Sequence, residues 1–211
     1  MRRSGVRVLS LALLMATPLA LGACGSLIAP RPFALSRAHF DEVSPLREAG
    51  VDRFLPWAED EAEIIVVDKP TRELALYRHG KLVKSYPVVL GRSPGRKIFE
   101  GDRRTPSGLY HVTAKRPHPK YDRFLDLDYP NDGDVTQYRS ALTGGLIPAV
   151  LGRRRGTGGL VGIHGSDKED FNRLGIDWTF GCVSLTNRDV EELFEYVGDG
   201  TPVVIRDDQQ P

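Results

Sequence analysis

Short apolar runs with the two-residue period of β-strands dominate the chain from Ile64 to Asp207. The stretch EIIVVD is followed by ELALYR and KLVKSYPVVLG, and the dipeptide His79-Gly80 between the last two favours a tight hairpin turn. Further strand patterns occur in SGLYHVTAK, GLVGIHG and TPVVIRD. Such runs bury their apolar side chains by joining into sheets. The chain is therefore predicted to be mainly β, a β-rich α+β protein with a compact sandwich-like or barrel-like sheet and few helices.

One long helix is predicted near the C-terminus, beginning at Thr186 or Asn187. Thr186 and Asp189 stand three residues apart, as in a capping box. The apolar residues that follow share one helical face, at Val190, Leu193, Phe194 and Val197. Gly198 and Gly200 are expected to end the helix.

The first residues have the pattern of an export signal. Three arginines precede an apolar run from Val8 to Leu21, which is shorter than the roughly 20 residues that a helix needs to span a bilayer. The run ends in LGAC, which resembles the lipobox of bacterial lipoproteins and implies removal of residues 1–23 and a lipid on Cys24. An ordinary signal peptide cut nearby is the alternative. The mature protein is expected to be anchored in the cell envelope facing the periplasm, and Gly25 favours the outer over the inner membrane.

Composition and proline spacing define the remaining organisation. Residues 24–61 carry four prolines among mixed charges and are predicted to form a tether with a possible short helix near His39 to Ala49. The compact domain is predicted over residues 62–207, with a tail at 208–211. Because 29 basic residues stand against 28 acidic ones, the chain lacks the broad positive field that nucleic acid binding requires. No metal-type spacing of cysteine and histidine occurs, so no metal and no cofactor is expected.

Cys182 is the second of only two cysteines. With Cys24 lipidated it has no internal disulfide partner, which leaves a buried small side chain, an intermolecular disulfide or a nucleophile. His164 ends a predicted strand, and Gly181 lets the backbone before Cys182 approach a ligand closely. An imidazole beside a thiol favours the thiolate at neutral pH. The spacing alone does not choose among the three roles.

Two separated motifs resemble the L,D-transpeptidase catalytic domain of the YkuD type, a family of cell-wall enzymes. The first is IHG, a gap and T-x-G-C-V, with an aspartate in the helix that follows; the second is YPVVLGRSPGRKIFEGDRRTPSGLYHV. The resemblance covers about Ile64 to Arg206. DWTFGCVSLTN and DYPNDGD are closer to the branch that carries TxGC-x-x-x-TN. The sequence departs from most members at Phe180, where they have histidine, and at Ser184, where they have asparagine or arginine.

The resemblance implies a peptidoglycan L,D-transpeptidase with a cysteine nucleophile. His164 would take the proton of Cys182, and the thiolate would attack a carbonyl of a stem peptide. The backbone N–H groups of Gly181 and Cys182 would hold the oxyanion, and the carbonyl of Gly165 would orient the imidazole. The resulting thioester would pass to an amine of a second stem peptide.

Other residues are candidates for substrate contacts with ordinary structural alternatives. The candidates are Arg153, Arg154, Tyr129, Trp178, Phe180 and Ser184. For the arginines the alternative is a solvated loop, and for the aromatic residues it is packing in the core or at its rim. The loop that contains Asp102, Thr105, Pro106 and Gly108 either shapes a turn or frames the site without touching substrate.

Three alternative functions stay open. A hydrolase of the same fold would release a peptidoglycan-linked lipoprotein or trim stem peptides. A wall-binding lipoprotein without activity is an alternative of another class. A papain-like peptidase would place its histidine after the cysteine, whereas no histidine follows Cys182. The expected partners are peptidoglycan stem peptides and, through the lipid, a membrane, and the oligomeric state is not predicted.

Overall fold

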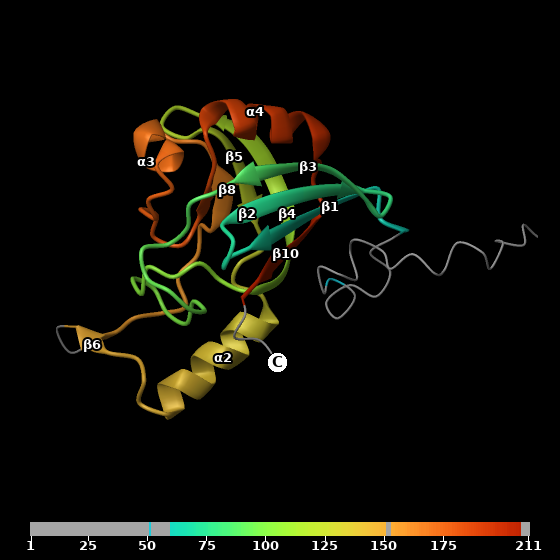
Figure 1. The fold of residues 1–211 in the computed structure, drawn as a ribbon. Helices are drawn as coiled ribbons and strands as arrows, with labels where there is room; N and C mark the ends of the chain where they lie inside the picture. The colour runs from blue at the N-terminus through green and yellow to red at the C-terminus, as the bar shows by residue number, and fades with distance from the viewer. Residues whose placement is uncertain (1–50, 52–59, 151–152, 208–211) are drawn as a thin grey trace, which may run out of the picture. The chain divides into compact units, whose positions relative to one another are not determined.

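The structure is a computed structural model that describes residue 51, residues 60–150 and residues 153–207 (Figure 1). These residues all belong to one compact unit, Asp41–Pro211. The predicted signal segment, Cys24, nearly all of the predicted tether and the tail at 208–211 lie outside the described residues.

The described residues form mostly strands, as predicted. The strands are β1 (Glu63–Asp68), β2 (Glu73–Arg78), β3 (Lys81–Pro87), β4 (Gly108–His118), β5 (Asp122–Leu127), β6 (Ala149–Val150), β7 (Arg153–Arg154), β8 (Gly162–His164), β9 (Val183–Ser184) and β10 (Pro202–Arg206). The helices are α2 (Asp132–Thr143), α3 (Glu169–Arg173) and α4 (Asn187–Tyr196). The prediction of a mainly β fold with few helices is confirmed.

One curled eight-stranded sheet organises the domain, in the order β3-β2-β1-β10-β4-β5-β8-β9. Its two edges meet. After β3, Val89 and Ser184 exchange backbone hydrogen bonds of 2.9 Å in both directions, and Gly91 forms a bridge with Thr179. The sheet therefore curls into a half-barrel, and the loop that follows β3 lies beside the segment that leads into β9.

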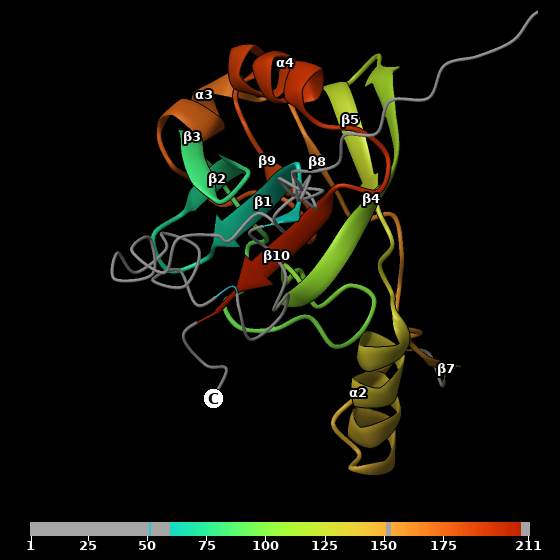
Figure 2. The same cartoon turned by 90° about the vertical axis from the view of Figure 1, so that its right-hand side faces the viewer.

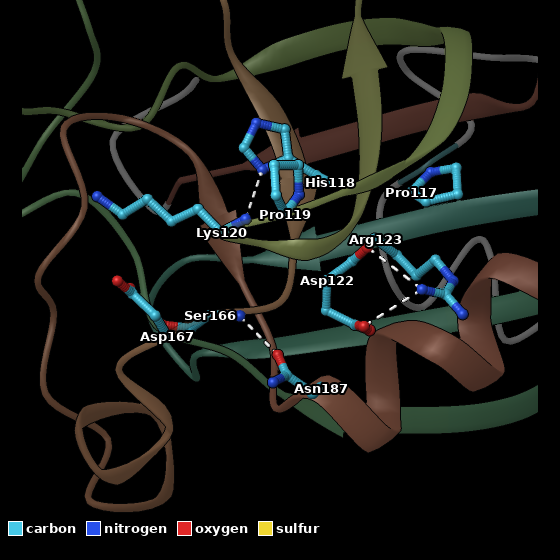
Figure 3. Close-up of a pocket in the computed structure, with 9 residues that line it drawn as sticks. All are labelled: Pro117, His118, Pro119, Lys120, Asp122, Arg123, Ser166, Asp167 and Asn187. Carbon is cyan, nitrogen blue, oxygen red and sulfur yellow. Dashed lines mark hydrogen bonds and ion pairs between the residues drawn. The ribbon is translucent and has the colours of Figure 1, made fainter.

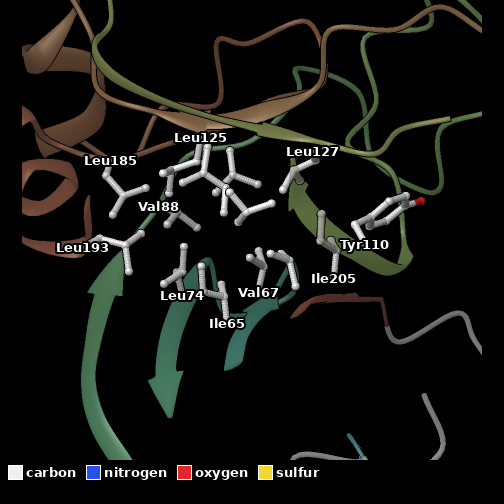
Figure 4. Close-up of a cluster of buried hydrophobic side chains, with 14 of the residues drawn as sticks. Ile65, Val67, Leu74, Val88, Tyr110, Leu125, Leu127, Leu185, Leu193 and Ile205 are labelled. Atoms are coloured by element: carbon white, nitrogen blue, oxygen red, sulfur yellow. The ribbon is translucent and has the colours of Figure 1, made fainter. Parts of the chain in front are cut away.

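Strand β1 is buried on both faces, which explains its nearly continuous apolar run. Ile65 and Val67 pack in the main core, whereas Ile64 and Val66 pack in a second cluster on the other face. Figure 4 shows the main core, in which side chains of the strands meet Leu193 of α4. Fully burying each such side chain contributes roughly 1.5–3 kcal/mol.

The local signals for the first hairpin and for α4 are confirmed. His79 and Gly80 both have positive φ, 46° and 73°, as the favoured two-residue hairpin turn requires. Thr186 caps α4 by accepting a hydrogen bond from the backbone N–H of Asp189 at 3.3 Å. The helix ends at Tyr196, just before the predicted glycines.

Helix α2 and strand β5 are missing from the sequence-based prediction. Helix α2 is longer than α4, 12 residues against 10, but it lacks an apolar stripe and buries only Asp134 and Ala141. A capping box between Asn131 and Asp134 starts it, and the buried carboxylate of Asp134 accepts a hydrogen bond from the hydroxyl of Tyr110 at 3.0 Å. Polar contacts thus hold α2 in place, at the end of the domain opposite α4 (Figure 2). No helix in the described part has the length and apolar content needed to span a membrane.

Candidate active site

The parallel pairing of β8 with β9 brings together the two residues singled out from the sequence. His164 lies opposite Ser184, and Ile163 lies opposite Val183. This register places Cys182, which directly precedes β9, beside Gly162, two residues from His164 along the neighbouring strand. The backbone of Gly162 accordingly lowers the pKa of the Cys182 thiol, although burial raises it more.

The imidazole of His164 is buried against aromatic rings. Its side chain is only 2% exposed, and its ring centroid lies 4.4 Å from that of Tyr121, 5.3 Å from Phe124 and 6.0 Å from Trp178. Nδ1 lies 2.5 Å from the carbonyl oxygen of Gly165. Because a carbonyl can only accept, Nδ1 carries the proton and Nε2 is left as the basic nitrogen. This is the contact that the sequence analysis assigned to Gly165, and its part in catalysis stays a prediction.

Behind His164 a chain of hydrogen bonds holds the carbonyl of Gly165. The hydroxyl of Ser184 donates to that carbonyl at 3.4 Å, and the side-chain amide of Asn172 donates to Ser184 at 2.9 Å. The indole of Trp178 in turn donates to Asn172 at 2.8 Å. Ser184 is fully buried and Trp178 nearly so. Both were candidates for substrate contacts, but the structure places them in the interior, where they support the histidine.

Cys182 faces a pocket of about 470 Å³ on the other side. The residues that line it are Lys97, Glu100, Gly101, Arg103, Arg155, Gly158, Gly159, Leu160, Val161, Phe180, Gly181 and Cys182. The thiol donates to the carbonyl of Leu160 at 3.5 Å. The glycines leave backbone exposed to the pocket, so an extended peptide can approach the sulfur closely.

The oxyanion role predicted for the Gly181 amide does not fit the structure. Its N–H donates to the hydroxyl of Thr179 at 3.1 Å, and that hydroxyl donates to the carbonyl of Cys182 at 2.7 Å. Through these two hydrogen bonds Thr179 stabilises the turn that presents the thiol, which is the physical role of the threonine in T-x-G-C. Gly181 itself has φ 144°, and a Cβ there would lie 2.8 Å from the carbonyl oxygen of Arg104. Of the two backbone N–H groups predicted to bind the oxyanion, that of Cys182 remains a candidate.

Burial acts on the ionisation of Cys182 and His164 in the direction opposite to the prediction. Although Cys182 is only partly buried as a residue, burial of its sulfur raises the pKa of the thiol to about 11. Burial lowers the pKa of His164 to about 4, and the hydrogen bond to Gly165 offsets only part of that effect. No hydrogen bond joins these two described side chains. Burial thus disfavours the charged form of both groups and opposes the thiolate that the sequence analysis expects in the free protein.

The remaining candidates divide between the pocket and its surroundings. Arg153 and Arg154 are exposed on β7 and do not line the pocket, whereas Arg155, the next residue, does. Tyr129 is 6% exposed and belongs to the main core. Phe180 lines the pocket with 64% of its surface exposed.

Two lysines that the sequence analysis did not single out shape the loop between β3 and β4. Lys97 is buried against the pocket and pairs with Asp102 at 2.9 Å, and Asp102 also accepts backbone hydrogen bonds from residues 98, 99 and 104. The ammonium of Lys69 lies within 3.0 Å of the carbonyls of Gly95 and Thr105 and of a carboxylate oxygen of Asp207. The loop therefore frames the site. No periodicity or motif in the sequence distinguishes these lysines from solvated ones.

A second pocket, of about 510 Å³, lies at the turn between β4 and β5 (Figure 3). It is lined by Pro117, His118, Pro119, Lys120, Asp122, Arg123, Ser166, Asp167 and Asn187. Neither Cys182 nor His164 lines this second pocket. The pocket of about 470 Å³ that contains Cys182 is therefore the candidate active site. Within the described ranges no group of three histidine, cysteine, aspartate or glutamate side chains is arranged to hold a metal ion.

Comparisons with known proteins agree with this geometry. The family model of the L,D-transpeptidase catalytic domain (YkuD) matches residues 62–205. The chain is 29% identical over 153 residues to YqjB of Bacillus subtilis (strain 168), whose name assigns it to the L,D-transpeptidases, covering 69% of this chain and 72% of YqjB.

Two solved structures are similar in fold. The helical cell shape determining protein Pgp2 from Campylobacter jejuni has a TM-score of 0.52 and 25% identity, over 71% of this chain and 49% of Pgp2. Bd1075 of Bdellovibrio bacteriovorus has a TM-score of 0.50 and 23% identity, over 70% of this chain and 48% of Bd1075. The chain thus spans about half the length of these two structures.

Proposed function

Because this chain belongs to the L,D-transpeptidase catalytic domain family, we propose that it is a peptidoglycan transpeptidase in which Cys182 is the nucleophile and His164 the base. The observation that carries the proposal is the pairing of β8 with β9. It sets a thiol at the wall of a pocket and, beside it, an imidazole whose Nδ1 is bound to the carbonyl of Gly165. Nε2 is thereby available to accept a proton.

The first step transfers the acyl group to sulfur. The Sγ atom of Cys182 attacks a carbonyl carbon of the donor stem peptide while its proton passes to Nε2 of His164. The carbon–nitrogen bond of the donor then breaks, and the leaving amine takes the proton from the imidazolium. Because burial raises the pKa of the thiol and lowers the pKa of the imidazole, we expect proton transfer to accompany the attack on a bound substrate.

The second step transfers the acyl group to an amine. The amine of another stem peptide attacks the thioester, gives its proton to His164 and releases the thiol of Cys182. The N–H of Cys182 is the proposed donor to the oxyanion in both steps, a contribution of about 3 kcal/mol for one such donor.

Mass spectrometry of the protein with purified disaccharide tetrapeptides tests this proposal. We expect an acyl adduct on the peptide that contains Cys182 and a crosslinked dimer in solution. The variant Cys182→Ser should give neither product. Dimer formation by Cys182→Ser would contradict the proposal, and hydrolysed peptide without dimer would identify water as the acceptor.

We further propose that the protein is exported and attached to the envelope by a lipid on Cys24, with the outer membrane as its destination. The support is the LGAC sequence at the end of the apolar run and the Gly25 that follows it. The mature protein should partition into the detergent phase of a detergent extraction, and Cys24→Ala should abolish this. Recovery of the mature wild type entirely in the aqueous phase would contradict the lipid anchor.

A further inference from the structure

Phe180 presents an exposed aromatic ring to the pocket that contains the thiol. It stands two residues before Cys182, and 64% of its surface is accessible. The neighbouring Thr179 and Gly181 are buried, so the backbone of this turn is fixed while the ring projects outwards. Packing in the core therefore does not explain an aromatic residue at this position.

Two arginines contact this ring. The guanidinium carbons of Arg92 and Arg103 lie 5.6 Å and 5.8 Å from its centroid, within the range of cation–π attraction. Arg92 is further oriented by a hydrogen bond from Nε to the carbonyl of Trp178 at 3.1 Å. Among the described residues neither arginine forms an ion pair. A guanidinium held against a ring keeps its in-plane N–H donors available for a planar anion.

The backbone of Arg103 is held in place. Its φ of 60° is left-handed, a conformation that costs a residue other than glycine roughly 1 kcal/mol or more and persists where the surroundings impose it. The carbonyl of Arg103 accepts a hydrogen bond from Ser93 at 3.0 Å, and a Cβ on Gly91 would lie only 2.4 Å from that carbonyl oxygen. The side chain therefore starts from a fixed point on the pocket wall.

The other charges of the pocket offset this positive charge only in part, because Glu100 is its one unpaired carboxylate among the described lining residues. Lys97 is neutralised by its pair with Asp102. The backbone of Glu100 is bonded to Gly156, and its side chain packs against the position where Gly158 would carry a Cβ. Arg155 adds another positive charge. The pocket thus favours an anionic ligand, and a carboxylate matches the planar donors of a guanidinium.

We propose that Arg103, held against Phe180 and assisted by Arg92, binds a carboxylate of the acyl donor beside the thiol of Cys182. The inference deepens the proposed function and rests on it for the identity of the donor as a stem peptide. It assigns the enzyme a preference for donors with a free carboxylate close to the carbonyl that is attacked.

Two small alkylating agents test the carboxylate site without any turnover. Iodoacetate and iodoacetamide react with the same sulfur but differ in charge, so the ratio of their rates at Cys182 reports attraction of a carboxylate. The rates are measured at pH 9 and low salt on the full chain, and the modified peptide is identified by mass spectrometry. The ratio cancels the fraction of thiolate, which is common to both reagents.

The expected result depends on which arginine is removed. Arg103→Gln should lower the iodoacetate to iodoacetamide ratio about three- to tenfold, and Arg92→Gln should lower it less. Arg139→Gln is the matched control, since Arg139 is exposed on α2 and does not line the pocket. It should leave the ratio unchanged. An equal ratio in all four proteins, or an equal fall in Arg139→Gln, would overturn the proposal.

Phe180→Leu tests the ring while retaining an apolar side chain. Loss of the aromatic face should lower the same ratio, and an unchanged iodoacetamide rate shows that the turn around Cys182 is intact. A ratio equal to that of the wild type would exclude a role for the ring.

A peptide comparison then connects the site with the substrate. A donor with a C-terminal carboxylate and the same donor as its carboxamide are supplied to the wild type and to Arg103→Gln. The carboxylate should lower KM for the wild type only. If no protein turns over either donor, the proposed function fails while the alkylation ratio still tests the carboxylate site. If turnover occurs and the two donors have equal KM, the carboxylate site fails alone.

Discussion

The two halves of the candidate active site are built differently. On the side of His164, rings enclose the imidazole, and the carbonyl that orients it is held by a chain of hydrogen bonds through Ser184, Asn172 and Trp178. On the side of Cys182, the pocket wall includes glycines, an exposed ring and two arginines, Arg103 and Arg155, without ion-pair partners in the described part.

This difference indicates how the work is divided. A buried polar chain whose members are all hydrogen-bonded fixes one geometry and resists rearrangement. A pocket with exposed backbone and unpaired positive charge is instead suited to receive a ligand. Changes on the histidine side should therefore affect the chemical step, and changes on the cysteine side should affect binding as well.

Removing either reacting group should give the largest effect and would test whether the two halves act as one unit. Cys182→Ser and His164→Gln should each lower turnover by at least about a thousandfold, and the double variant should lose little more than either single one. Rates come from the peptide assay, and circular dichroism confirms that the samples are comparably folded. Independent, additive losses would show that His164 does not serve the attack by Cys182.

The resting ionisation of the pair should give the next largest effect. Burial raises the pKa of Cys182 to about 11, so the thiolate fraction and the iodoacetamide rate should rise about tenfold per pH unit between pH 7 and pH 10. His164→Gln should label at the wild-type rate at pH 7, because the neutral imidazole does not ionise the thiol of the free protein. If the iodoacetamide rate of the wild type is flat above pH 7 and that of His164→Gln is slower, the free protein contains a preformed thiolate and this prediction is wrong.

The sequence predicted most of the longer strands and singled out Cys182 and His164, but it did not predict the supports of the site. Alternating apolar residues and the Thr186 cap are local signals, so the sheet and α4 follow from them. The raised pKa of Cys182 depends on how much protein surrounds the sulfur, which no local pattern reveals. The same holds for Lys97, whose partner Asp102 is near in sequence but whose burial comes from the closure of the sheet.

The predictions that the structure corrects concern a backbone amide, the placement of one side chain and one helix. Gly181 was predicted to expose its amide, but the Thr179 hydroxyl occupies that amide. Ser184 was a candidate for substrate contact, yet it lies opposite His164 on the neighbouring strand and is buried in the interior. Helix α2 escaped prediction because a capping box, not an apolar face, defines it.

The turn that presents the thiol should show the next largest effect. Substitutions at two glycines with positive φ distinguish the cost of backbone strain from the cost of a steric clash. Gly181→Ala meets both a positive φ of 144° and a carbonyl oxygen at 2.8 Å, so we expect a loss of several kcal/mol in unfolding free energy. Gly95→Ala is the control, since Gly95 has φ 85° but nothing within 4 Å of the added Cβ, and it should lose only about 1 kcal/mol. Urea unfolding measures both. Equal losses would mean that the contact with Arg104 relaxes freely.

The smallest expected effect lies on the histidine side, at Ser184. In Ser184→Ala the carbonyl of Gly165 still accepts from His164, and Asn172 still donates to the carbonyl of Leu185, so no partner is left without a hydrogen bond. The unfolding free energy should therefore fall by only about 1 kcal/mol. Since the carbonyl that orients the imidazole loses one of its two donors, kcat should fall a few-fold while KM stays the same.

Ser85→Ala is the matched control for this change, because Ser85 is exposed on β3 and does not line the pocket that contains Cys182. It should leave kcat, KM and stability unaltered. The contrast with Arg103→Gln is the sharper measurement, since a base-side change that spares KM and a pocket-side change that raises it would separate positioning from binding. A rise in KM for Ser184→Ala would instead place this buried hydroxyl within reach of substrate, and the division between the two halves would fail there.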